Sequence, residues 1–136
     1  MGYRSSVVCL MYGNNDIGDN TIVKEFVRSR VEAYTGSNMV SYADVNVIKD
    51  AFDYSGWGVK FQADDWKWYD SYADIQFLEQ LFDEFEELVI GDDASETSYA
   101  LEFVRVGEEI EDIEQRMRGA IEGRLYITRC ISVDGN

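Results

Sequence analysis

The chain has 136 residues, the size of one ordinary domain, and its 27 acidic and 12 basic residues give a net charge of −15. Hydrophobic residues make up 46% of the sequence, too many for a disordered acidic tail, and no apolar run approaches the roughly 18 residues of a membrane helix. The absence of histidine excludes histidine-based catalytic triads and histidine metal ligands.

The same sequence predicts one intracellular domain over residues 1–136. The first six residues lack the apolar core and the small-residue cleavage site of a signal peptide. Proline is absent, so no rigid proline-rich linker divides the chain. We therefore expect a cytoplasmic protein without a membrane-bound part.

Strand and helix patterns alternate through the first half of the chain. β-branched and apolar residues predict a strand over residues 4–12, and a polar turn follows it. Apolar residues at helical spacing predict a helix over residues 20–34, with Asn20 as its cap. We expect a short strand over residues 39–42 and a short helix over residues 44–52.

An aromatic segment follows in which apolar and polar residues alternate. Trp57, Val59 and Phe61 are separated by single residues, a period of two that indicates a half-buried strand. Asp64 and Asp65 are typical of a tight turn, after which residues 66–69 return as a second strand. Two interpretations remain open, a hairpin or one long strand with a bulge.

The strongest helical pattern covers residues 71–89. Its apolar residues line one face, and most of its acidic residues face away from it. The apolar face consists of Ile75, Leu78, Leu81, Phe82, Phe85, Leu88 and Val89.

The last third of the chain predicts a strand over residues 99–106, a helix over residues 109–120 and a final strand over residues 125–133. Strands at both ends with helices between them indicate an α+β fold. We expect a mainly antiparallel sheet with about three helices packed on one face.

The two cysteines, Cys9 and Cys130, lie in apolar, strand-like segments at opposite ends of the chain. They are either two buried thiols that act as small hydrophobic residues or a disulfide that joins neighbouring strands. Neither has a second soft ligand nearby in the sequence, so we expect no zinc site.

The negative charge is concentrated in residues 64–114, which hold 18 acidic residues and only two basic ones. The helix over residues 71–89 has no basic residue at all, so like charges four residues apart repel each other there. Either this face is merely solvated, or it serves a basic partner. The second interpretation predicts these contact residues: Asp74, Glu79, Asp83, Glu86, Glu87, Glu109 and Asp112.

Carboxylates on rigid helices can imitate the phosphates of a nucleic acid. A helix rises about 1.5 Å per residue, and duplex DNA carries one charge per about 1.7 Å of its axis. Two acidic helices side by side, over residues 71–89 and 109–119, would approximate two rows of phosphates. A chain of this charge should not itself bind DNA or RNA.

Carboxylate clusters also suggest an enzymatic alternative. Glu108, Glu111 and Asp112 would share one face of a helix and could hold a magnesium or calcium ion or support hydrolysis. The oxygen-rich loop over residues 14–20 lacks the spacing of an EF-hand. We expect the neighbouring tryptophans to fill the core rather than to stack on sugars, and we assign no catalytic residue, metal ligand or cofactor.

Three arginines lie within predicted strands, namely Arg4, Arg105 and Arg129. Arginine rarely enters an apolar surface without a partner. Ion pairs with acids such as Glu108 or Asp112 are one explanation, and a pocket for an anionic ligand is the other.

Several segments together resemble a group of small, mostly uncharacterised phage and prophage proteins. They are Met1-Gly2-Tyr3-Arg4-Ser5, Trp68-Tyr69-Asp70, Phe103-Val104-Arg105-Val106-Gly107-Glu108-Glu109 and Asp112-Ile113-Glu114. The sequence departs from the group's pattern at Ala73, where a proline is expected. The resemblance implies a phage setting, and therefore a host-cell cytoplasm, but transfers no catalytic residue.

Charge and resemblance together predict a non-enzymatic inhibitor. We expect an acidic protein of phage type that binds a basic surface on a host nucleic-acid-handling complex, as anti-CRISPR and anti-restriction proteins do. The alternative is a small carboxylate-based metal-binding or hydrolytic domain.

Overall fold

The computed structural model describes residues 4–13, 17–36, 45–90, 99–109, 111–118, 125–127 and 131–133. In chain order, its elements are β1 (Ser5–Gly13), α1 (Ile17–Ala33), α2 (Val45–Asp50), β2 (Phe52–Ser55), β3 (Gly58–Trp66), α3 (Ala73–Ile90), β4 (Tyr99–Gly107), β5 (Ile113–Arg118), β6 (Leu125–Ile127) and β7 (Ile131–Val133). The predicted strand over residues 39–42 lies outside the described residues.

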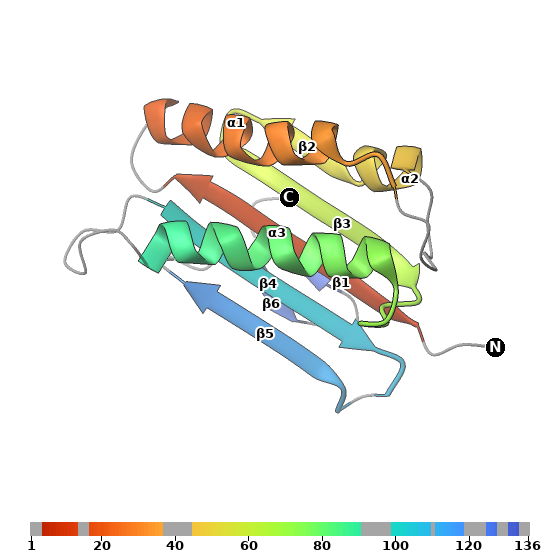
Figure 1. Cartoon of the computed structure of the whole chain (residues 1–136). Helices are drawn as coiled ribbons and strands as arrows, with labels where there is room; N and C mark the ends of the chain where they lie inside the picture. The colour runs from red at the N-terminus through yellow and green to blue at the C-terminus, as the bar shows by residue number, and fades with distance from the viewer. Residues whose placement is uncertain are drawn as a thin grey trace.

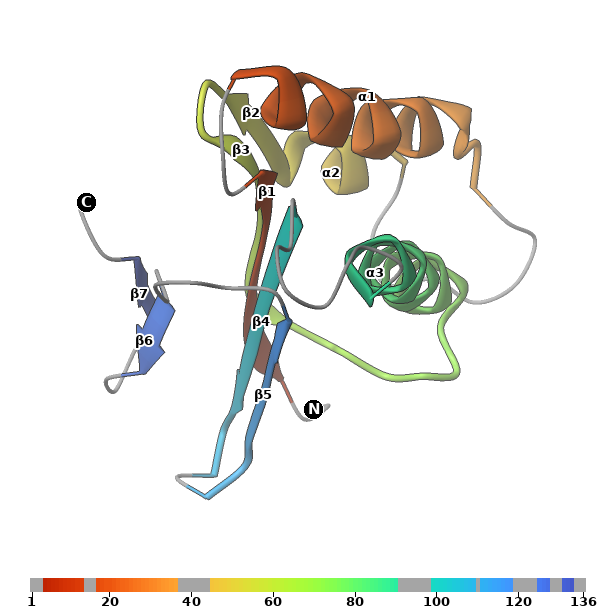
Figure 2. The ribbon, with the colours of Figure 1, turned by 90° about the vertical axis from the view of Figure 1, so that its left-hand side faces the viewer.

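Strand β1 lies at the centre of a five-stranded sheet with the order β2-β3-β1-β4-β5 (Figure 1). All neighbouring strands are antiparallel, and Cys9 of β1 lies opposite Phe61 of β3 and Phe103 of β4. Helices α1, α2 and α3 all lie on one face of the sheet (Figure 2). This arrangement confirms the predicted α+β fold, with its antiparallel sheet and three helices on one face.

Aromatic side chains dominate the core between the helices and the sheet. Phe82 of α3 packs between Phe61 and Phe103, with ring centroids 5.6 and 5.8 Å apart. The predicted apolar face of α3 is buried here, apart from Leu88, which is half-buried. Helix α1 adds Val23, Val27 and Val31, which are one turn apart.

Helix α1 begins three residues before the predicted cap. The side chain of Asn20 is used differently, because its Oδ1 accepts a hydrogen bond from the backbone N–H of Gly13 at 2.8 Å. Asn20 therefore ties the helix to the end of β1 instead of capping it. The short helix predicted around residues 44–52 is confirmed as α2.

The aromatic segment forms one long strand with an irregularity, as the second interpretation predicted, and residues 66–69 do not return as a strand. The register against β1 shifts opposite Asp64 and Asp65, and Asp65 has a φ of 63°. The hairpin lies earlier, between β2 and β3. Gly58 is required there, because a Cβ at its φ of 143° would approach the carbonyl oxygen of Met11 to 2.5 Å.

The helix predicted over residues 109–120 is wrong, because the chain forms strand β5 from Ile113. Ile113 and Met117 are four residues apart, a spacing that fits a helix, but the intervening residues also alternate with a period of two. The alternation prevails in the fold, where β5 pairs with β4 over six residues and the guanidinium of Arg116 lies over the Phe103 ring, 4.7 Å from its centroid. Two acidic helices therefore do not lie side by side.

A second apolar cluster lies on the face of the sheet opposite the helices. It is formed by Val8, Leu10, Tyr12, Ala100 and Val104, and it surrounds the buried Glu102. The Tyr12 hydroxyl donates a hydrogen bond of 2.6 Å to Oε2 of Glu102. Strands β6 and β7 lie on this side (Figure 2) and pair with each other, so the single strand predicted over residues 125–133 is wrong.

Helices long and apolar enough to cross a membrane are absent from the described part of the chain.

Candidate functional site

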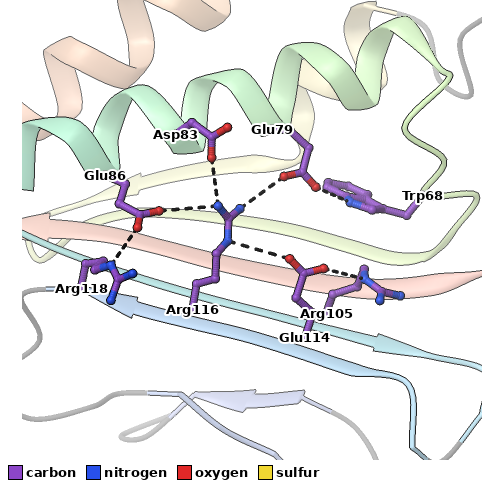
Figure 3. A network of polar contacts seen from close by, with 8 residues as sticks. All are labelled: Trp68, Glu79, Asp83, Glu86, Arg105, Glu114, Arg116 and Arg118. Atoms are coloured by element: carbon purple, nitrogen blue, oxygen red, sulfur yellow. Dashed lines mark hydrogen bonds and ion pairs between the residues drawn. The ribbon is translucent and has the colours of Figure 1, made fainter.

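The acidic side of α3 faces β5. Glu79, Asp83 and Glu86 are spaced four and three residues apart, so they lie along one side of the helix. Figure 3 shows the three carboxylates directed from α3 toward the arginines of β5. The apolar face of α3 fixes this orientation, since Phe82 and Phe85 are fully buried against the sheet.

Arg116 is the shared cation of this cluster. Its Nη1 lies 2.9 Å from Oδ1 of Asp83, and its Nη2 lies 3.3 Å from Oε2 of Glu79. Longer contacts of 3.5 Å and 4.0 Å join it to Glu86 and Glu114 (Figure 3). One guanidinium thus serves four carboxylates, which leaves an excess of negative charge around it.

Two further arginines bound the cluster. Arg118 lies 2.8 Å from Glu86. Arg105 holds Asp112 through both of its terminal nitrogens, at 2.8 and 3.2 Å, and donates to Oε1 of Glu114 at 3.3 Å. The predicted pairing of Arg105 with Asp112 is confirmed and is bidentate, but Asp112 lies just before β5 instead of on the expected helix, so the pair does not tie a helix to the sheet.

Glu79 is a half-buried carboxylate of the cluster, with 27% of its side chain exposed. Burial raises the pKa of its carboxyl, whereas a hydrogen bond from Trp68 and the charge of Arg116 act to lower it. The Trp68 indole nitrogen donates this bond to Oε1 at 2.9 Å (Figure 3). Tryptophan and arginine therefore hold the two oxygens of Glu79 in a fixed orientation.

Two adjoining cavities lie beside these residues, between the first turns of α3 and the paired ends of β1, β4 and β5. One has a volume of about 450 Å³ and the other about 390 Å³, and both are lined by Asp70, Glu79 and Glu114. We call them together the acidic groove. Asp83 lines the first cavity, and Asp112 and Arg105 line the second. Five carboxylates and one arginine in the lining favour cationic groups such as ammonium or guanidinium.

The structure separates the seven predicted contact residues into two sets. Glu79, Asp83, Glu86 and Asp112 come together around the arginines of β4 and β5. Among the ion pairs between described residues, none joins Asp74, Glu87 or Glu109 to this cluster. Asp74 is fully buried in the first turn of α3, where its Oδ1 accepts a hydrogen bond from the N–H of Ile75 at 3.0 Å.

Sequence reasoning missed four residues of the site, namely Asp70, Glu114, Arg116 and Arg118. The alternation of charged residues at 114, 116 and 118 is the signal that could have revealed three of them, because it places their side chains on one face of a strand. Assigning this segment to a helix concealed that face. Asp70 carries no comparable signal, since it lies in the loop that precedes α3.

The three carboxylates of the enzymatic alternative, which were expected to share one helix face, do not come together. Glu108 and Glu111 are exposed near the turn between β4 and β5, and Asp112 is held by Arg105. The helix face that was to unite them does not exist. Within the described residues, no group of three or more acidic or cysteine side chains is arranged to hold a metal ion.

Cys9, the buried tryptophans and Arg4, which the sequence also singled out, lie outside the acidic cluster or support the fold. Cys9 is a buried free thiol, and desolvation raises its pKa well above the ordinary value, while Cys130 lies outside the described residues. Trp66 and Trp68 are buried in the core, as predicted. Arg4 donates to the carbonyl oxygen of Asp65 at 3.0 Å, and Arg129 lies outside the described residues.

No family model matches this sequence, and no curated protein or solved structure is significantly similar to it.

Proposed function

We propose that this chain is a non-enzymatic acidic binding protein of phage type. It docks on a basic surface of a host nucleic-acid-handling complex and blocks that complex, as anti-CRISPR and anti-restriction proteins do. The observation that carries the proposal is the acidic groove, whose two adjoining cavities together are lined by five carboxylates and one arginine.

Lysine and arginine side chains of a partner are the groups that this groove fits. Its two cavities have room for such side chains, and they open beside the exposed edge of α3. Asp83 supports this role because 62% of its side chain remains exposed although it contacts Arg116. A partner cation would therefore meet carboxylates that internal arginines neutralise only in part.

The proposed contact surface consists of Asp70, Asp83, Glu87 and Glu114. Glu87 is exposed one turn beyond Asp83, and Asp70 is exposed in the lining of both cavities. Glu79, Glu86 and Asp112 support this surface from within, through their arginines. Asp74 is buried and takes no part.

Long-range electrostatics supports the same role. A net charge of −15 accelerates encounter with a basic surface and repels free nucleic acid. Binding of this kind weakens as salt rises, because attraction between exposed charges is screened over about 10 Å at 0.1 M salt.

Two matched triple variants test the proposal. D70N/D83N/E87Q neutralises three exposed acids of the contact surface, and E25Q/E32Q/D50N neutralises three exposed acids on or near α1 and α2. The wild type is used to capture partners from a nuclease-treated bacterial lysate. Affinity for the purified partner is then measured with all three proteins, and inhibition of that partner's nucleic-acid binding is measured in parallel.

The proposal expects the first variant to bind at least about tenfold more weakly, equivalent to 1.4 kcal/mol, and to lose inhibition. The second variant should stay close to the wild type, because only the total charge differs from it. Equal effects of both variants would contradict the proposed surface. Micromolar binding of the wild type to duplex DNA would contradict the proposed function itself.

A further inference from the structure

Strand β5 is at one edge of the five-stranded sheet. Among the strands that the structure describes, it pairs with β4 alone, and Figure 1 shows it as the outermost strand. The opposite edge, β2, has four residues, whereas β5 has six. An edge strand presents unpaired N–H and C=O groups to any strand that can approach it.

Symmetry restricts how β5 could pair with another copy of itself. In an antiparallel ladder, two opposite residues direct their backbone groups either toward each other or away from each other. Identical strands related by a twofold axis must therefore place one residue opposite its own copy. Only a few registers satisfy this condition, and each is named by its central residue.

The register centred on Gln115 places each flanking residue of β5 opposite a residue of complementary character in the second copy. It places Glu114 opposite Arg116 of the second copy, and it does so twice because of the twofold axis. On the other face of the sheet, it places Ile113 opposite Met117. Directly opposite ion pairs and apolar pairs each stabilise an antiparallel ladder.

The neighbouring registers bring like charges together. A register centred on Glu114 places the two copies of Glu114 opposite each other, and a register centred on Arg116 does the same with the two copies of Arg116. A centre at Met117 places Arg116 opposite Arg118. Like charges directly opposite each other destabilise a ladder, so the sequence of β5 selects the centre at Gln115.

Two side chains of β5 are accessible for this pairing, whereas Arg116 already contacts Glu79 and Asp83 of its own chain. Ile113 is 44% exposed, although it is a large apolar residue, and the side chain of Glu114 is exposed to the same extent. Pairing with Met117 of a second copy would cover Ile113. Glu114 would gain Arg116 of the second copy in addition to its contacts within one chain, which are 3.3 Å to Arg105 and 4.0 Å to Arg116.

We propose that β5 binds β5 of a second copy of this chain, with Gln115 on the twofold axis, so that two five-stranded sheets join into one. The helices of both copies then lie on the same face of the joined sheet, because opposite residues of a ladder share a face. This inference goes beyond the proposed function and does not depend on it. A six-residue ladder buries little surface, so the dimer forms at high protein concentration.

Salt distinguishes this association from the proposed binding of a basic partner. Two copies that each carry a charge of −15 repel each other at long range, and salt screens the repulsion. The dimer should therefore strengthen between low and moderate salt, whereas binding to a basic partner should weaken.

Charge substitutions at Gln115 test the register. Gln115 is exposed, so Q115K and Q115E should each leave the monomer folded. Each variant alone places like charges on the axis, whereas a mixture of the two places lysine opposite glutamate. Q62K and Q62E, at an exposed residue of β3, provide the same charge changes away from the edge.

Sedimentation equilibrium up to about 0.1 mM, in moderate salt, measures the result. We expect a dimer of twice 15.6 kDa for the wild type and the Gln62 variants. Q115K and Q115E alone should each dimerise at least about tenfold more weakly, and their mixture should recover dimers. A monomeric wild type at this concentration, or a dimer that Q115K and Q115E leave unchanged, would overturn the proposal.

Discussion

Helices α1 and α3 cover the same face of the sheet but carry opposite charge patterns. Helix α1 has three acidic and three basic residues, whereas α3 has six acidic residues and no basic one. The cations that α3 lacks come from elsewhere, namely Arg116 and Arg118 of β5 and Arg30 of α1, which pairs with Glu84. The charge balance of a helix is thus set by its neighbours in space.

The acidic residues of α3 therefore have two roles to be distinguished, pairing within the chain and contact with a partner. The absence of lysine at helical spacing indicated a surface kept for a basic partner. The arginines of β5 give a second reason why α3 has no lysine, because they neutralise part of its acidic cluster from the neighbouring strand. The proposed contact surface therefore moves outward, to Asp83, Glu87 and the lining of the acidic groove.

The largest expected difference between the two helices concerns their apolar faces. Phe82→Ala should lower the free energy of unfolding by about 3–5 kcal/mol, because it empties the space between Phe61 and Phe103. Val27→Ala in α1 should cost about 2 kcal/mol, since it removes two buried methyl carbons. Urea denaturation measures both, and equal losses would contradict a core centred on α3.

A smaller difference is expected between the arginines that serve the two helices. Arg116→Gln should cost about 1–3 kcal/mol, because it leaves Glu79 half-buried without its cation. Arg30→Gln should cost less than about 1 kcal/mol, because both Arg30 and Glu84 are more than one-third exposed. Thermal and urea unfolding of the two variants test this order, and a reversed order would contradict the role of Arg116 as the shared cation.

The smallest effect concerns pH. Burial raises the pKa of the Glu79 carboxyl above its ordinary value of 4.5, so the folded protein holds this proton more tightly than the unfolded chain. The contribution of Glu79 to the free energy of unfolding is therefore present at low pH and falls as pH rises from 4.5 through the raised pKa.

Two substitutions distinguish the titration of Glu79 from that of the other ionisable groups. Glu79→Gln should remove the fall over that pH range, whereas Trp68→Phe should enlarge it, because the indole N–H acts to lower the same pKa. Urea denaturation at a series of pH values measures the difference. An unchanged pH profile in Glu79→Gln would show that Glu79 does not titrate differently in the folded state.

Much of the fold was predictable, because local patterns were long and consistent. The helix over residues 71–89 was identified from seven apolar residues on one face, and β1 from its β-branched and apolar residues. Strand β5 was not predictable, because Ile113 and Met117 satisfy both helical and strand spacing within its six residues. Short segments of this kind are decided by tertiary contacts, here by the pairing of β5 with β4.

The site was less predictable than the fold for a related reason. The pair between Arg105 and Asp112 was foreseen because an arginine inside an apolar strand requires a partner. The contacts of Arg116 depend on which strand lies beside α3, and residue spacing does not specify that neighbour. Carboxylates were therefore recognised as exposed charges, and their internal pairing was missed.

The position of Cys9 has a practical consequence for kinetic experiments. Its thiol is fully buried in the central strand, beneath both long helices, and burial keeps it protonated. An alkylating reagent reaches it only when the central strand separates from its surroundings, so the rate of Cys9 labelling reports how often the core opens. With Cys130 replaced by serine, Cys9 is the only thiol, and its labelling rate measures the opening of the least accessible part of the molecule.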